Sequence, residues 1–108
     1  MGVLYNYSTP TLTLNFKAVD ISAGYDHYVT FSRPLSEKKI LELHGESLVV
    51  TEHAIECFLS QEETALMPKG KVLIQVNYLY NDGHNIRRIP SVKKEIMWDT
   101  NLKDEVIE

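Results

Sequence analysis

The chain contains a single cysteine, Cys57, among its 108 residues. Without a second cysteine no intrachain disulfide can form, and zinc sites built from several thiolates are excluded. Cys57 lies within an alternating apolar segment, so we expect it to be a small buried core residue. The four histidines are not spaced as paired metal ligands, so the sequence predicts neither a metal site nor another cofactor.

Long apolar runs and concentrated positive charge are also lacking. No segment approaches the roughly 20 apolar residues that a membrane-spanning helix needs, so we expect no membrane insertion. The first residues show neither the basic start nor the apolar stretch of a secretion signal, and none is expected. A net charge of −4 and scattered basic residues argue against a nucleic-acid partner, because such proteins carry a basic face.

The motifs of common enzymes are missing too: there is no nucleophile elbow, phosphate-binding loop or dinucleotide fingerprint. The neighbouring carboxylates of Glu62 and Glu63 could serve acid–base chemistry, but Ser-Gln-Glu-Glu at 60–63 is a helix capping box that accounts for both. Asn-Asp-Gly at 81–83 lacks the spaced acidic ligands of a calcium loop, and a hairpin turn is the simpler interpretation. We therefore expect a protein that is not an enzyme.

Regular alternation is what the chain does have, most clearly over residues 71–80. Apolar or aromatic side chains stand there at every second position: Val72, Ile74, Val76, Tyr78 and Tyr80. This period predicts a long strand lying on a core. Asp-Gly at 82–83 predicts a tight turn into a return strand over about 85–88. Pro90 cannot donate to a ladder, so the return strand is expected to be an edge strand or to be interrupted there.

Shorter segments of the same kind cover the rest of the chain. They are residues 11–16, 28–32, 39–44, 48–50 and 54–59, and a final apolar segment from Val92 to Trp98. Residues 40–43 also fit one helical turn, and a short helix is expected between Ser60 and Pro68. About seven short strands with frequent turns predict an all-β fold, a single antiparallel β-sandwich domain over residues 1–108 with one short helical turn.

Tyrosine and tryptophan side chains are the ones best suited to recognition. Tyr5 and Tyr7 lie in an N-terminal segment without periodicity that is not expected to join the core, and both an interface and disorder are open interpretations for it. Together with Trp98 they are the candidate interface residues. Tyr78 and Tyr80 either continue the core face of their strand or, if exposed with Trp98, form a platform on which sugars stack.

Five short segments follow one another in a characteristic order. They are residues 7–14 (Tyr-Ser-Thr-Pro-Thr-Leu-Thr-Leu), 28–32 (Tyr-Val-Thr-Phe-Ser), 59–64 (Leu-Ser-Gln-Glu-Glu-Thr), 72–77 followed by Asp-Gly at 82–83, and 101–107. In this order they resemble a small domain of phages and prophages of Gram-positive bacteria. The domain is the immunoglobulin-like N-terminal module of phage baseplate upper proteins, which also occurs as short stand-alone proteins. This chain departs from the pattern at residues 33–34 and 87–90, both near expected sheet edges.

The resemblance implies an immunoglobulin-like sandwich that attaches to tail or baseplate proteins and has no enzymatic activity. A trimer or hexamer would fit the symmetry of phage tails, and the final location would be the virion. Removing residues 1–8 is expected to leave the fold intact and to weaken assembly. The alternative is a carbohydrate-binding module for receptor adhesion that uses exposed tyrosines. A third hypothesis, an accessory enzyme or inhibitor, would need a polar pocket.

Overall fold

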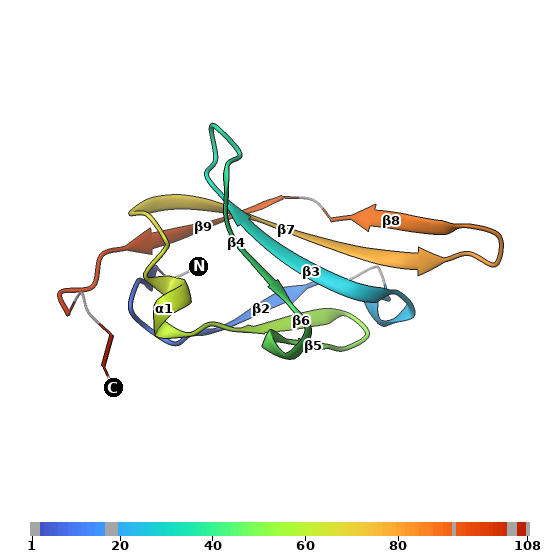
Figure 1. The fold of residues 1–108 in the computed structure, drawn as a ribbon, viewed down its shortest axis with the longest axis horizontal. Coiled ribbons are helices and arrows are strands. Elements are labelled where there is room, and N and C mark those ends of the chain that lie inside the picture. Colours follow the sequence, from blue (N-terminus) through green and yellow to red (C-terminus); the bar gives the residue numbers. More distant parts are fainter. Residues whose placement is uncertain (1–2, 17–19, 92, 104–105, 108) are drawn as a thin grey trace.

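The computed structural model describes residues 3–16, 20–91, 93–103 and 106–107. Within these ranges the elements, in chain order, are β1 (Leu4–Tyr5), β2 (Thr11–Asn15), the 3₁₀ helix η1 (Ile21–Ala23), β3 (Tyr25–Ser32), β4 (Lys39–His44), the 3₁₀ helix η2 (Gly45–Ser47), β5 (Leu48–Val50), β6 (Ala54–Phe58), α1 (Gln61–Thr64), β7 (Gly70–Asn81), β8 (Ile86–Pro90) and β9 (Lys94–Asp99) (Figure 1). The predicted start of the last apolar segment, Val92, lies outside the described residues.

The strands form two sheets that share one core. The large sheet has the order β1-β9-β7-β3-β4, with β8 also paired to β7, and the small sheet has the order β2-β6-β5. In Figure 1 the small sheet lies below the large one, and α1 closes one end. This arrangement confirms the predicted all-β sandwich with a short helical turn. Purely antiparallel pairing was the wrong expectation, since β1 pairs with β9 in parallel.

β7 is the central strand of the large sheet, and buried positions alternate along most of its length. Val72, Ile74 and Val76 are 0%, 2% and 1% exposed and belong to the core. One flank of β7 pairs with β3, whereas the other pairs first with β9 and then with β8. Ser91 spans the interval between these two partners, since its amide donates to the Val76 carbonyl at 2.7 Å and its hydroxyl accepts from the Val76 amide at 2.9 Å. The return strand is therefore interrupted just after Pro90, as predicted.

Both sheets contribute alternate residues to the core. The buried side chains include Leu14, Ile55 and Cys57 from the small sheet, and Val29, Phe31, Leu43, Ile96 and Trp98 from the large one. Burying one large apolar side chain stabilises a fold by about 1.5–3 kcal/mol. Because these residues recur at every second position, each strand keeps one face free for polar side chains.

The predicted capping box is confirmed at the start of α1. The Glu63 amide donates to Ser60 Oγ at 3.1 Å, and the Ser60 amide donates to Glu63 Oε1 at 2.9 Å. Thr64, at the end of the same turn, is fully buried and bonds to the backbone of Ser8. The helix therefore anchors the N-terminal segment as well as connecting two strands.

The molecule is elongated, with principal extents of 51 × 31 × 21 Å. The hairpin of β7 and β8 accounts for part of this length, because it extends past the end of the small sheet (Figure 1). The side chains at the hairpin tip are accordingly mostly exposed.

Candidate functional site

The reactive side chains of the described ranges do not form a metal centre. Among these residues no three His, Cys, Asp or Glu side chains are grouped so that they could hold an ion. Cys57 is fully buried, as predicted, and burial raises the pKa of its thiol to about 12. Because the thiolate is the nucleophilic form, this cysteine is unreactive near neutral pH.

Trp98 cannot serve the interface role expected for it. Its side chain is 1% exposed and lies in the core of the large sheet. The reason is the alternation of β9, in which Ile96 and Trp98 point inward and Met97 is 44% exposed. The indole Nε1 is buried and has no hydrogen-bond partner in the part of the chain that the structure describes.

The N-terminal segment joins the large sheet, although it was expected to remain apart from the core. Leu4 and Tyr5 pair with Trp98 and Asp99 in β9, and Leu4 packs against the core. The side chain of Tyr5 is 50% exposed, whereas Tyr7 is half-buried and has a φ of +54°. Tyr5 thus remains accessible to a partner, while Trp98, its predicted companion, does not.

The tyrosines of β7 divide between core and solvent. Tyr78 is 8% exposed, stacks on His27 with a centroid distance of 5.2 Å, and covers Gly24. A Cβ added to Gly24 would lie 2.2 Å from the Tyr78 ring, so only glycine fits there. Tyr80 is 38% exposed, so the expectation that it continues the core face was wrong. The reason is that the hairpin extends beyond the end of the small sheet (Figure 1). With Tyr78 and Trp98 both buried, the three residues cannot form the expected sugar platform.

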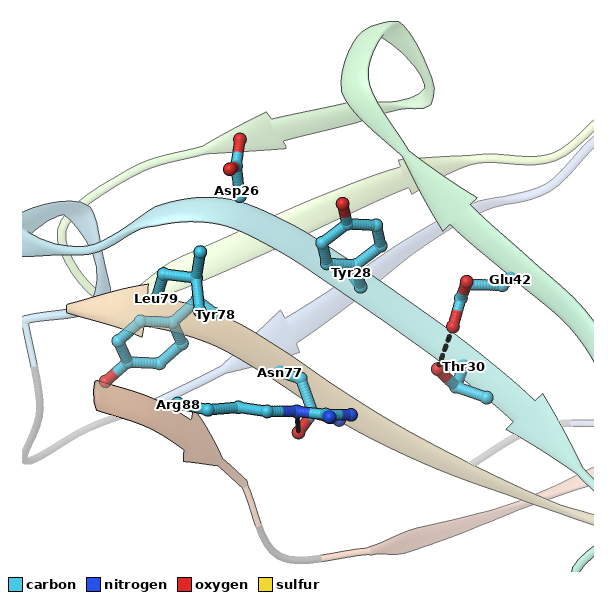
Figure 2. A pocket seen from close by; sticks show the side chains of 8 residues that line it. All are labelled: Asp26, Tyr28, Thr30, Glu42, Asn77, Tyr78, Leu79 and Arg88. Atoms are coloured by element: carbon cyan, nitrogen blue, oxygen red, sulfur yellow. Dashed lines mark hydrogen bonds between the residues drawn. The ribbon is translucent and has the colours of Figure 1, made fainter. Parts of the chain in front are cut away.

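A hollow that the sequence did not predict lies on the outer face of the large sheet (Figure 2). Its volume is about 300 Å³, and β3, β4, β7 and β8 contribute residues to it: Asp26, Tyr28, Thr30, Glu42, Asn77 and Arg88, among others. On β3 and β7 these positions alternate with the buried ones. The outward-facing positions of these alternating strands therefore line the hollow, whereas the inward-facing positions form the core.

Two hydrogen bonds join neighbouring strands within the hollow. Thr30 Oγ1 donates to Glu42 Oε1 at 3.1 Å, and Arg88 Nε donates to Asn77 Oδ1 at 3.3 Å (Figure 2). Asp26 lies where β3 shifts register against β7 and has a φ of +50°, a conformation that aspartate tolerates better than most residues. These contacts fix the edges of the hollow on four strands.

The tip of the β7–β8 hairpin is held by one carboxylate. Asp82 Oδ1 accepts from the amides of His84 and Asn85 at 2.9 and 2.8 Å, and Oδ2 accepts from Arg87 Nε at 2.6 Å. The Arg87 bond, aided by the two amide bonds, lowers the pKa of Asp82 to about 2. The predicted turn over 81–83 is present, with Gly83 at a φ of +95°. The projecting hairpin is therefore an ordered structure.

No family model matches the chain, and no curated protein does either. None of the helices in the described ranges is long and apolar enough to cross a membrane.

Proposed function

We propose that this chain is a non-enzymatic structural module of a phage or prophage tail or baseplate, which acts by docking to other proteins. The order of the short segments that resemble baseplate modules supports this role, and a β-sandwich is the fold that the resemblance implies. Within the tail a trimer or hexamer of the chain would follow the symmetry of the particle.

The observation that carries the proposal is the open edge of β8. Of the described strands, only β7 pairs with β8. All of its residues except Ile89 are exposed, and Ile86 is 63% exposed. An unpaired edge strand is a template on which another protein can add a strand.

The backbone of β8 is suitably oriented for such pairing. Ser91 bonds through its amide to Val76 of β7, and in an antiparallel pair the groups directed at the partner alternate along the strand. The amide and carbonyl groups of Ile86 and Arg88 therefore point away from β7. Pro90 stands two residues after Arg88, so the backbone groups at this position also point away from β7. Its missing N–H therefore leaves the pairing with β7 intact. The free edge therefore offers two N–H donors, from Ile86 and Arg88, and three carbonyl acceptors, from the same two residues and Pro90.

The charge of this edge indicates the chemistry of its partner. Arg88 forms no ion pair with any described carboxylate, although the chain as a whole carries a net charge of −4. Like charges facing each other across a ladder are destabilising, so two copies of β8 are poorly matched to one another. An extended segment that carries acidic side chains is the better match.

Purified particles test whether the chain is a tail component. Particles from a host that carries the phage or prophage would be separated on a density gradient, and the chain quantified by mass spectrometry. We expect the chain to co-purify with tail proteins in threefold or sixfold copy number. Its absence from intact particles would overturn the proposal.

A pair of variants at Ile86 tests the docking edge separately. Ile86→Pro removes an outward N–H at the start of β8, whereas Ile86→Ala shortens the side chain and keeps that donor. We expect both proteins to fold, as judged by circular dichroism, but only the alanine variant to enter particles. Equal incorporation of the two would show that the chain docks elsewhere.

A further inference from the structure

The hollow on the outer face of the large sheet is separate from the backbone edge of β8 and needs its own explanation. Its volume of about 300 Å³ is at the small end of ligand sites. Most of its lining residues carry a polar group, but apolar atoms make up the larger share of its exposed surface. The following argument does not depend on the docking role.

One wall of the hollow is a supported aromatic ring. Tyr28 of β3 stacks on His44 of β4 with a centroid distance of 4.3 Å and an interplanar angle of 6°. His44 covers one ring face and does not line the hollow, so the hollow meets the rest of the Tyr28 ring. Because the imidazole supports the ring from behind, little side-chain freedom is lost when a ligand packs on it.

Several polar groups around this ring have no partner within the described part of the chain. Among the described residues, none bonds to the Asp26 carboxylate, the Tyr28 hydroxyl or the terminal nitrogens of Arg88. The Asn77 amide nitrogen is likewise left to donate, since its oxygen accepts from Arg88. Donors and acceptors therefore surround one aromatic surface (Figure 2).

The balance of charge in the hollow selects among ligand classes. Asp26 and Glu42 disfavour an anion, and the Arg88 guanidinium offsets one of their two negative charges. An apolar ligand would leave the free polar groups desolvated, at a cost in affinity. An uncharged molecule with many hydroxyl groups and one C–H face avoids both penalties.

We propose that this hollow binds a neutral saccharide. One sugar ring would place its C–H face on Tyr28, where the negative face of the aromatic ring attracts the weakly positive hydrogens. Its hydroxyl groups would donate to Asp26 and Glu42 and accept from Asn77 and Arg88. The site differs from the platform expected from the sequence, because Tyr78 lines it but Tyr80 and Trp98 do not.

Titration of the isolated chain with neutral oligosaccharides tests this site. The probes are maltotriose, cellotriose and tri-N-acetylchitotriose, and amide chemical shifts from NMR report both affinity and location. We expect at least one probe to bind with millimolar or tighter affinity and to shift resonances of β3, β7 and β8 around Tyr28. No localised shift with any of the three would overturn the proposal.

Variants then separate the hollow from adventitious contacts. Tyr28→Ala is expected to weaken binding by about tenfold, which corresponds to about 1.4 kcal/mol. Phe58→Ala removes an exposed ring from the small sheet and should leave binding unchanged. Arg88→Ala tests the same hollow from β8 if Tyr28→Ala fails to fold. Equal effects at Phe58 and in the hollow would contradict a specific site. Because these measurements use the free chain, they are independent of particle assembly.

Discussion

The side chain of Thr64 makes hydrogen bonds within the fold that local sequence patterns do not reveal. Among the polar and charged side chains of the described residues, it is the only one that is buried. Its hydroxyl donates to the Ser8 carbonyl at 2.8 Å and accepts from the Ser8 amide at 3.0 Å. A side chain 56 positions away in sequence therefore satisfies both backbone groups of Ser8.

Thr64→Val tests this contact with little change of shape. The substitution leaves two backbone groups of Ser8 without their partner, and we expect the free energy of unfolding to fall by about 1–3 kcal/mol. Thr11→Val, at an exposed position of β2, is the matched control and should change stability little. Urea denaturation followed by circular dichroism measures both. Equal effects would mean that the Thr64 hydroxyl contributes nothing specific.

Residue identities alone predicted most of the core but not its limits. Val72 and Val76 were expected on the core face from their period, and both are fully buried. Tyr80 obeys the same period yet is exposed, because burial also requires a facing sheet, and the extent of that sheet is not encoded in β7. The hollow escaped prediction for a related reason: Arg88 meets Asn77 only through the register of the hairpin.

At the scale of elements, local patterns were a better guide. The boundaries expected for 39–44 and 48–50 are those of β4 and β5, and the capping box starts α1 as expected. β1 was missed because its two residues carry no periodicity and pair with β9, almost the whole chain length away. The spacing of apolar residues along a strand indicates which of its faces is buried, whereas the strands it pairs with depend on contacts between residues distant in sequence.

The β7–β8 hairpin is the element whose order should depend on pH. The pKa of Asp82 is lowered in the folded protein, to about 2, so its bonds stabilise the tip fully above the ordinary value of about 3.9. This contribution is lost as the pH falls from about 4 towards 2. We expect the Asp82 carboxyl resonance in NMR to titrate near pH 2, while Arg87→Met should move that midpoint towards 4. An unchanged midpoint in the variant would show that Arg87 is not the main cause.

At the scale of the whole molecule, the N-terminal segment connects the two sheets. β1 belongs to the large sheet and β2 to the small one, and the residues between them bond to α1 and to the end of β9. Asn6 donates through its amide to Asp99 at 3.1 Å and accepts from the Asn101 amide at 2.7 Å. The segment thus holds three parts of the sandwich together at one end.

Deleting residues 1–8 should therefore destabilise the fold, in contrast to the expectation from sequence that these residues serve assembly alone. The deletion removes the apolar contact of Leu4 with the core and the bonds between Ser8 and Thr64. Together these losses amount to about 2–5 kcal/mol, a large part of the roughly 5–15 kcal/mol that stabilises a typical domain. Since Leu4 also lies beside Trp98, we expect the tryptophan fluorescence to shift to longer wavelength.

Removal of residues 106–108 is the control for that deletion, because Ile107 is bound to Gln61 only through exposed hydrogen bonds. Thermal melts of the two truncated proteins should differ clearly, with the C-terminal deletion close to the full chain. If the N-terminal deletion melts at the same temperature and its fluorescence is unchanged, the segment does not connect the sheets energetically. Its exposed Tyr5 would then be free to serve a partner alone, as the sequence had suggested.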